Sequence, residues 1–83
     1  MASVNWSADA LKDLETMDPV IAKRIVEKVL WLEEHFASVI PEKLRRGLKY
    51  LYKLRVGDYR IVYSLRQEAI TIQAVGHRRD IYR

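Results

Sequence analysis

Residues 52–63 read Tyr52-Lys53-Leu54-Arg55-Val56-Gly57-Asp58-Tyr59-Arg60-Ile61-Val62-Tyr63, and they carry the strongest local signal in the chain. β-Branched and aromatic residues flank a Gly-Asp pair, which is typical of a tight turn between two antiparallel strands. The sequence therefore predicts strands over Leu48–Val56 and Tyr59–Leu65, joined at Gly57 and Asp58.

The residues that follow this hairpin predict a third strand. Residues 66–68 turn the chain, and Ala69–His77 is again rich in β-branched residues. With the two-residue period of a strand, Ile70, Ile72 and Ala74 are predicted on one face and the intervening polar residues on the other.

Two helices and a short strand are predicted before the hairpin. Val4 and Trp6 alternate with polar residues, as in an opening strand, and Ser7 then suits the N-cap of a first helix. Asp18 and Pro19 suit the cap and first position of a second helix. That helix carries one apolar stripe at helical spacing, which we interpret as core and which ends close to His35: Ile21, Ile25, Val29, Leu32 and Phe36.

The element order is strand, two helices, three strands. This order predicts an α+β domain spanning residues 1–83, in which a two-helix layer packs on one face of a mostly antiparallel four-stranded sheet. The other face is left open, and the basic residues lie on the strands that build it. The segment 37–47, which contains Pro41 and Gly47, is expected to be a loop.

The amino-acid composition indicates the cellular compartment in which the protein works. The 83 residues include no cysteine, which excludes disulfides and thiolate metal sites and favours a reducing cytosol. Residues 1–6 lack the pattern of a signal peptide, and no apolar stretch approaches the roughly 18 residues of a membrane span. We therefore expect a soluble cytoplasmic protein with no membrane partner.

Charge is distributed unevenly along the chain. Residues 1–42 hold four basic and eight acidic residues (net −4), whereas residues 43–83 hold eleven basic and three acidic residues (net +8). This asymmetry within one domain indicates a polyanion partner for one face. A solvated basic surface without a specific partner is the alternative interpretation.

Common catalytic signatures are absent from the sequence. There is no glycine-rich phosphate loop and no cysteine nucleophile, and His35 and His77 lack carboxylate partners at metal-ligand spacing. We expect no metal and no small-molecule cofactor. What remains is a dense basic and aromatic set, whose interleaving suits single-stranded RNA better than duplex DNA. Within this set, Tyr63 could equally be a core residue.

Such a set can cleave RNA without a metal. The reaction needs a base for the 2′-hydroxyl, positive groups for the phosphorane and an acid for the leaving 5′-oxygen. Lysine, with a free pKa of ~10.4, becomes a better base where arginine neighbours lower its pKa. Tyrosine or histidine can carry the proton.

The quoted stretch 52–63 resembles the central signature of the RelE/ParE toxin superfamily. The ending Val75-Gly76-His77-Arg78-Arg79-Asp80-Ile81-Tyr82-Arg83 is similar to its closing motif, and Lys43-Leu44-Arg45 is similar to its loop. The resemblance covers essentially the whole chain. It implies a RelE-like fold and a toxin that cleaves messenger RNA in the ribosomal A site by 2′-hydroxyl attack, held inactive by a cognate antitoxin.

The resemblance also implies residue roles. Lys53 matches a family lysine that is implicated in proton transfer. Arg60 matches an arginine that stabilises the transition state, and Arg78 matches a second arginine, which binds phosphate. Tyr82 matches a terminal tyrosine that orients or stacks on the substrate. Some RelE members carry a basic residue where this chain has Leu51. Either His77, whose free pKa of ~6.5 suits proton transfer, takes over part of the acid–base work, or turnover is slower. The remaining candidates are substrate-binding: Arg45, Arg46, Lys49, Arg55, Tyr59, Arg79 and Arg83.

Each of these assignments has a structural alternative. Lys53 could be a solvated strand lysine, Arg60 could pair with Asp58 or Asp80, and His77 could be a strand-end residue bound to backbone.

Three functions remain open at this point. The first is the ribosome-dependent mRNA endonuclease, with ribosome, mRNA and antitoxin as partners. The second is a ParE-like inhibitor of DNA gyrase without nuclease activity, and the third is an antitoxin-bound, inactive nucleic-acid-binding module. The joint presence of Lys53, Arg60, Arg78 and Tyr82 favours the first, since a gyrase inhibitor needs no phosphate-cleaving cluster. In each case, an acidic amphipathic helix or strand of the antitoxin is expected to cover the basic face.

Overall fold

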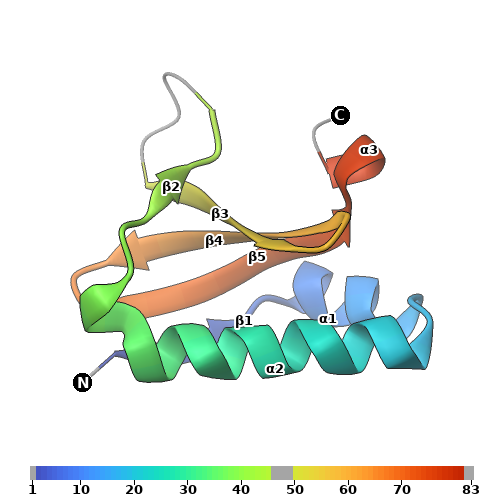
Figure 1. Cartoon of the computed structure of the whole chain (residues 1–83), viewed down its shortest axis with the longest axis horizontal. Coiled ribbons are helices and arrows are strands. Elements are labelled where there is room, and N and C mark those ends of the chain that lie inside the picture. The colour runs from blue at the N-terminus through green and yellow to red at the C-terminus, as the bar shows by residue number, and fades with distance from the viewer. Residues whose placement is uncertain (1, 46–49, 82–83) are drawn as a thin grey trace.

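The computed structural model describes residues 2–45 and 50–81. Its elements in chain order are β1 (Ser3–Trp6), α1 (Ala8–Glu15), α2 (Pro19–His35), the 3₁₀ turn η1 (Phe36–Ser38), β2 (Glu42–Lys43), β3 (Leu51–Val56), β4 (Tyr59–Arg66), β5 (Ala69–His77) and α3 (Arg78–Ile81). The sheet order is β1-β5-β4-β3-β2, with β1 parallel to β5 and every other pair antiparallel. Helices α1 and α2 lie on one side of this sheet, and β2 and α3 rise on the other (Figure 1). None of the described helices has the length and apolar character to cross a membrane.

The two predicted helix starts are confirmed by their caps. The Ser7 hydroxyl accepts a hydrogen bond from the Ala10 amide at 3.0 Å, and the Asp18 carboxylate accepts one from the Val20 amide at 2.8 Å. Pro19 occupies the first turn of α2, where its missing amide costs nothing. The sequence thus places both helices correctly because short polar side chains satisfy otherwise unpaired amides.

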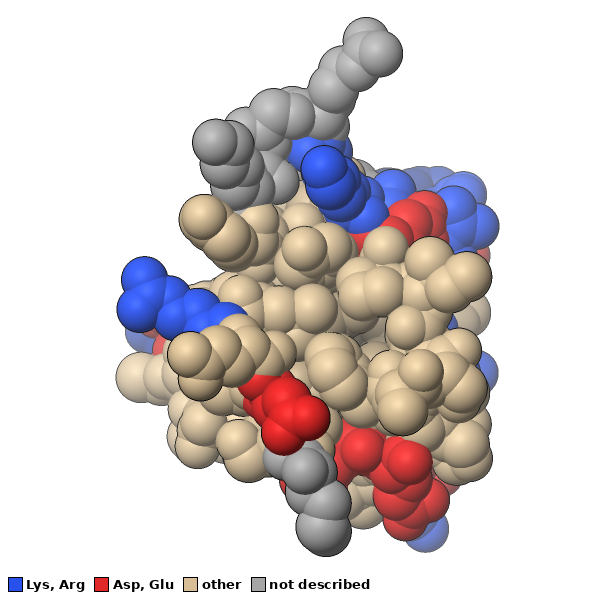
Figure 2. Space-filling model, turned by 90° about the vertical axis from the view of Figure 1, so that its left-hand side faces the viewer, with Lys and Arg blue, Asp and Glu red and all other residues tan. Residues whose placement is uncertain are grey.

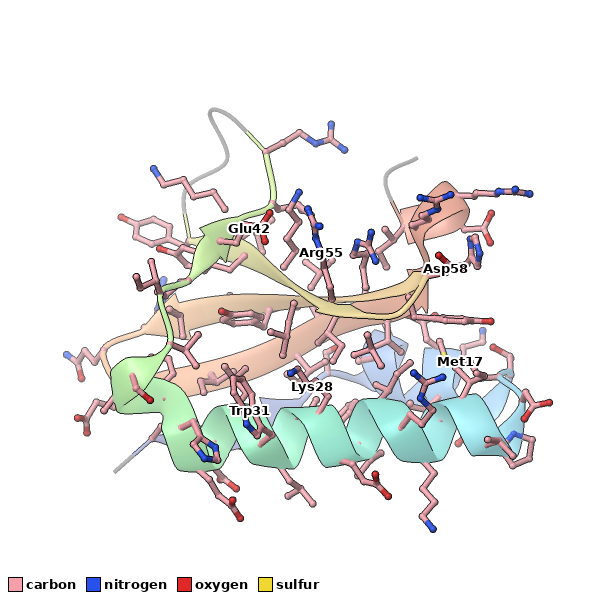
Figure 3. All side chains as sticks on the ribbon, viewed as in Figure 1. Met17, Lys28, Trp31, Glu42, Arg55 and Asp58 are labelled. Atoms are coloured by element: carbon pink, nitrogen blue, oxygen red, sulfur yellow. The ribbon has the colours of Figure 1, made fainter. Side chains whose placement is uncertain are left out.

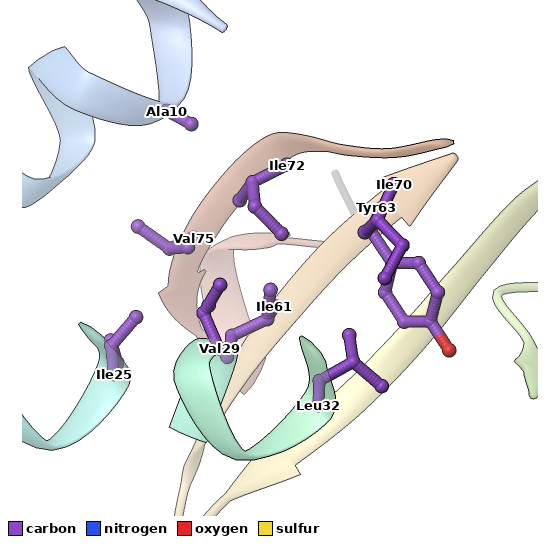
Figure 4. Close-up of a cluster of buried hydrophobic side chains, with 9 residues drawn as sticks. All are labelled: Ala10, Ile25, Val29, Leu32, Ile61, Tyr63, Ile70, Ile72 and Val75. Atoms are coloured by element: carbon purple, nitrogen blue, oxygen red, sulfur yellow. The ribbon is translucent and has the colours of Figure 1, made fainter. Parts of the chain in front are cut away.

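The core lies between α2 and the sheet (Figure 4). Helix α2 contributes the buried centre of the predicted apolar stripe, and β4 and β5 contribute the facing side chains. Tyr63 is fully buried within this cluster, so its interpretation as a core residue is confirmed. The buried cluster consists of Ala10, Ile25, Val29, Leu32, Ile61, Tyr63, Ile70, Ile72 and Val75.

The sheet has five strands, so the prediction of four was wrong by one. The additional strand, β2, is only two residues long and pairs Glu42 with Lys53 and Lys43 with Tyr52. Two polar residues show no apolar alternation, and they lie between Pro41 and Gly47, the residues from which a loop over 37–47 is predicted.

Strand β3 is shorter at its start than predicted. Tyr50 has φ +69°, a left-handed conformation that does not continue a strand, and β3 begins at the next residue. Residues 48 and 49, which the prediction included, lie outside the described residues. The hairpin turn itself is as predicted, with Gly57 at φ +57°.

A bulge interrupts the pairing of β4 with β5. Val62 pairs with Ala74 and Tyr63 pairs with Ile72, which leaves Gln73 without a partner in β4. The extra residue shifts the alternation, so Val75 is buried in the core and Ala74 is not, contrary to the prediction for Ala74. The Asp13 carboxylate on α1 accepts a hydrogen bond from the Val75 amide at 3.1 Å and so ties α1 to β5 just after the bulge.

Candidate nucleic-acid interface

The basic residues of the central strands lie on the sheet face that points away from the helices. In β3, Leu54 and Val56 pack against the core, so the alternate positions Lys53 and Arg55 face the other way. The register places Arg55 directly opposite Arg60 of β4. The sheet therefore brings Lys53, Arg55 and Arg60 onto one open surface, here called the cationic face.

The surface view agrees with this arrangement. Many lysine and arginine side chains gather at the upper end of the molecule with acidic atoms among them, others project at mid-height, and acidic side chains are more frequent at the lower end, toward the helices (Figure 2). On the face shown, positive charge is thus densest on the side of the sheet that the helices leave open, where it attracts a negative ligand.

One carboxylate lies among these cations. Oε1 of Glu42 is 3.5 Å from Nζ of Lys53 and 3.5 Å from an Nη atom of Arg55. The Lys53 side chain is only 20% exposed, whereas that of Arg55 is 64% exposed. Sequence reasoning expected arginines to be the charged neighbours of Lys53 and missed Glu42. The sequence offered one signal, namely that Glu42 is the last acidic residue before the basic segment 43–83 begins.

Arg60 is anchored to the hairpin that precedes it. Its Nη1 donates to the carbonyl oxygens of Gly57 at 3.0 Å and Tyr59 at 2.9 Å. Backbone carbonyls thus hold one side of the guanidinium, which limits the orientations available to its other nitrogens. A fixed planar cation of this kind suits recognition of a phosphate group.

The closing motif folds back toward the same end of the sheet. The Arg78 amide donates to the Asp58 carbonyl at 2.8 Å, which ties the start of α3 to the hairpin turn. Gly76, which pairs with Arg60, is covered by Ile81: a Cβ added at Gly76 would lie 3.5 Å from Cδ1 of Ile81. Helix α3 therefore lies over the cationic face beside the Arg60 position.

His77 and Tyr59 lie elsewhere. They pair across β4 and β5, and their rings meet edge-on with centroids 5.4 Å apart. Tyr59 packs against the core, so alternation places this pair on the helix side of the sheet, and both residues line a cavity with Asp13 and Met17. Nδ1 of His77 accepts a hydrogen bond from the Arg79 amide at 3.1 Å. The structure does not bring His77 into the row of Lys53, Arg55 and Arg60.

Of the other predicted site residues, the structure describes some and not others. Arg45 is exposed just after β2. Arg46, Lys49, Tyr82 and Arg83 lie outside the described residues. Among residues 2–45 and 50–81, no group of three or more histidine, aspartate or glutamate side chains is arranged to hold a metal ion.

The buried tyrosine at the edge of this region is protonated over the whole physiological range. Burial, and to a lesser extent the nearby Tyr52 and Glu42, raise the pKa of Tyr63 to about 12. Its ring is tilted against that of Tyr52, with centroids 5.7 Å apart, beneath the strand that carries Lys53. Tyr63 therefore supports the site by packing.

A two-helix layer on one face of this sheet, with a cationic face opposite and a short helix at the chain end, defines a RelE-like α+β toxin domain. Residues 4–82 match the family model described as "ParE toxin of type II toxin-antitoxin system, parDE". The chain is also 31% identical over 83 residues to Toxin RelG of Mycobacterium tuberculosis, covering 98% of this chain and 95% of that toxin. The chain belongs to the RelE/ParE family of type II toxins.

Solved structures agree with this assignment. The toxin–antitoxin complex RelBE2 of Mycobacterium tuberculosis contains a chain with TM-score 0.79 and 28% identity, covering 92% of this chain and 96% of that one. The RelB–RelE complex of Methanococcus jannaschii gives TM-score 0.69 and 30% identity, covering 94% of each chain. The isolated E. coli RelE toxin, at 22% identity and TM-score 0.75 over 93% of this chain and 84% of that one, shows the same fold.

Proposed function

We propose that this toxin is a ribosome-dependent endoribonuclease that cleaves messenger RNA in the ribosomal A site without a metal ion. The observation that carries the proposal is the row of Lys53, Arg55 and Arg60 on the open face of the sheet. A polyanion approaching that face meets three cations from two adjacent strands, and the anchored guanidinium of Arg60 is suited to a phosphate. The family membership and the relative RelG support the same class of function.

The proposed reaction is an in-line transfer within the RNA. The 2′-hydroxyl oxygen attacks the adjacent phosphorus, the bond from phosphorus to the 5′-oxygen breaks, and a 2′,3′-cyclic phosphate and a free 5′-hydroxyl result. Lys53, whose ammonium lies beside the Glu42 carboxylate, is proposed to take part in removing the 2′-proton. Arg60 and Arg78 would stabilise the negative charge that builds on the phosphorane.

The remaining assignments concern the leaving group and binding. Tyr82 is proposed to orient or stack on the substrate, as the resemblance implies. The position of His77 on the helix side of the sheet, against Tyr59, does not support the share of proton transfer that the sequence predicted for it. The residues proposed to bind the substrate are Arg45, Arg46, Lys49, Arg55, Arg79 and Arg83. Tyr59, which was predicted with them, packs against the core on the helix side of the sheet, and this position does not support substrate binding. This reaction requires the ribosome and mRNA as partners, and therefore the cytoplasm.

The direct test is to incubate the purified toxin with ribosomes carrying a defined mRNA and to map cuts by primer extension. Wild type is expected to give discrete cuts at A-site codons. Lys53→Ala and Arg60→Ala are each expected to lower the cleavage rate by about a hundredfold, the usual effect of removing a transition-state contact worth roughly 3 kcal/mol. Absence of cleavage by folded wild-type protein would exclude the nuclease.

A second candidate function is inhibition of DNA gyrase without nuclease activity. The observation in its favour is the match of residues 4–82 to the ParE toxin model. A supercoiling assay with purified gyrase separates the two, because the nuclease leaves supercoiling unaffected at concentrations that cleave mRNA on ribosomes.

We also propose that a cognate antitoxin neutralises this toxin by laying an acidic segment over the cationic face. Two similar toxins were crystallised as toxin–antitoxin complexes, which supports a partner of this kind. The affinity should fall steeply with salt, because charged groups separated by more than about 10 Å are screened at 0.1 M ionic strength.

A further inference from the structure

His77 lies at the junction between β5 and α3. It is the last residue of β5, and α3 begins at Arg78. Nδ1 of His77 accepts a hydrogen bond from the Arg79 amide, the second amide of α3, at 3.1 Å. The first amides of a helix have no partner within the helix, and a side chain that accepts from the second or third of them caps the helix. The His77 imidazole is therefore the N-cap of α3.

The ring of Tyr59 holds this imidazole in place. The two residues pair across β4 and β5, and their rings meet edge-on at an interplanar angle of 80°. Tyr59 itself packs against the core. Because a residue packed on the core supports the His77 ring from one side, packing as well as the hydrogen bond fixes the orientation in which Nδ1 meets the start of α3.

Helix α3 depends on contacts of this kind because it has only four residues. Isolated helices shorter than roughly 12 residues are marginal in water, so groups outside α3 must hold it. The Arg78 amide donates to the Asp58 carbonyl at 2.8 Å, and the next amide donates to His77. Figure 3 shows Asp58 at the end of the molecule where α3 lies. The hairpin turn and His77 thus share the anchoring of the helix that begins with Arg78.

The surroundings of the His77 ring on the helix side are acidic. The cavity beside it is lined by carboxylates from α1, from the N-cap of α2 and from α3, and Figure 3 shows Met17, another residue of this lining, on the helix side of the sheet at the same end. The titratable and charged groups around the ring are Asp13, Asp18, Tyr59, Arg78, Arg79 and Asp80. An imidazolium carries a proton on both nitrogens and cannot accept a hydrogen bond, whereas carboxylates attract it. Protonation of His77 therefore removes the cap and favours a ring position toward the carboxylates.

We propose that His77 is a positioning residue for the proposed cleavage reaction. Its neutral imidazole caps α3 and so holds the start of that helix, which carries Arg78, near Arg60 at the cationic face. Protonation of the ring releases this hold and lowers activity. His77 acts through the helix and does not contact the RNA, as its place on the helix side of the sheet requires. This inference rests on the proposed function, in which Arg78 stabilises the charge on the phosphorane.

The first test compares His77→Ala with His77→Asn in single-turnover cleavage of mRNA on ribosomes, at about pH 8. Both substitutions remove the imidazole and its contact with Tyr59, but asparagine is among the best N-cap residues and alanine is a poor one. His77→Ala is expected to lower the cleavage rate about fivefold, the usual effect of losing a cap, and His77→Asn is expected to stay within about twofold of wild type. Equal losses in the two variants would overturn the proposal, because they would show that the ring acts by packing alone.

The pH profile provides a test that does not require the alanine variant to fold. The ratio of the wild-type cleavage rate to the His77→Asn rate is measured from about pH 8 to about pH 5.5, since titrations that both proteins share cancel in this ratio. The ratio is expected to fall severalfold around pH ~6.5, where histidine ordinarily titrates, because asparagine keeps its cap when histidine is protonated. A ratio that does not change with pH would contradict the proposal.

Nuclear magnetic resonance of the full chain detects the cap without any cleavage. The Arg79 amide resonance is expected to shift with the titration of the His77 ring in wild type and to stay fixed in His77→Asn. The Arg78 amide, which donates to the Asp58 carbonyl, is the internal control and should shift less, although it is closer to His77 in sequence. A smaller shift at Arg79 than at Arg78 would exclude the cap. Wild type that shows the expected shifts but does not cleave mRNA contradicts the proposed nuclease, and with it the positioning role, and leaves the cap itself standing.

Discussion

Glu42 and Lys53 face each other across the β2–β3 pair, with the carboxylate oxygen 3.5 Å from the lysine nitrogen. The same oxygen is 3.5 Å from Arg55. In the free toxin an acidic side chain therefore occupies the space between two cations that are proposed to meet RNA.

Replacing Glu42 by glutamine should strengthen RNA binding. The carboxylate repels an incoming phosphate and neutralises part of the positive charge of Lys53 and Arg55, and the amide does neither. A unit charge a few ångströms away in water changes affinity roughly fivefold at low salt. Fluorescence anisotropy with a 2′-O-methyl oligonucleotide, which binds but cannot be cleaved, measures the change.

The matched control is Glu34→Gln, which removes the same charge from an exposed position of α2. Its RNA affinity should stay close to that of wild type. The stability of Glu42→Gln should differ by less than about 1 kcal/mol, since partly exposed ion pairs contribute little. Equal RNA affinity of wild type and Glu42→Gln would show that RNA does not approach Lys53 and Arg55.

The hairpin turn gives a stability prediction. Gly57 has φ +57°, a region that costs other residues roughly 1 kcal/mol, and an added Cβ meets no atom closer than Arg24 Nη2 at 3.7 Å. Gly57→Ala should therefore lower the free energy of unfolding by about 1 kcal/mol for conformational reasons alone, as measured by urea denaturation. Gly76→Ala serves as the comparison, because Gly76 has no positive φ and an added Cβ has ordinary contact with Ile81. A loss as large at Gly76 would argue against the conformational explanation.

The buried tyrosine predicts how stability depends on alkaline pH. Burial raises the pKa of Tyr63 from 10.0 to about 12, so the folded state binds this proton more tightly than the unfolded state. This contribution is complete below pH 10 and is lost as the pH rises through 12, by roughly 2–3 kcal/mol in total. Because other groups titrate in the same pH range, the free energy of unfolding is measured against pH for both wild type and Tyr63→Phe. The part of the decline that is due to Tyr63 should be missing in Tyr63→Phe. Parallel declines in the two proteins would contradict the assignment.

Much of this fold follows from local sequence signals. Ser7 and Asp18 cap the helices where predicted, and β5 has the predicted bounds, because capping and two-residue alternation act over short distances. The bulge at Gln73 was not predictable, since it arises from pairing with β4 and a hydrogen bond from α1. The two-residue strand β2 exists only because it pairs with β3.

The candidate site also has a part that local sequence signals predict and a part that they do not. Alternation along β3 and β4 was enough to place Lys53, Arg55 and Arg60 on the open face. The position of Glu42 beside them depends on the path of the chain after α2, which no local pattern encodes. The bulge adds one residue to β5, so the orientation of His77 also depends on pairing that the sequence does not reveal.

Arg60 allows the roles of charge and anchoring to be separated. Arg60→Ala removes both the cation and the two hydrogen bonds to the carbonyls of Gly57 and Tyr59. Arg60→Lys keeps the charge. However, lysine lacks the planar guanidinium, which can donate hydrogen bonds to the hairpin carbonyls and to a phosphate at the same time. We expect cleavage on ribosomes to fall about a hundredfold in Arg60→Ala and to a lesser degree in Arg60→Lys, with single-turnover rates as the measurement.

The comparison variant is Arg66→Ala, at the opposite end of the same strand. Arg66 is exposed and lies an even number of residues from Arg60, so alternation places both on the same side of β4. Removing Arg66 takes away the same charge from the same strand. At about 3.3 Å per residue, Arg66 lies some 20 Å from Arg60 along β4. If bulk positive charge accounted for activity, Arg66→Ala and Arg60→Ala would lose cleavage equally. A loss confined to Arg60, partly restored by lysine, would show that one positioned cation acts on the reacting phosphate.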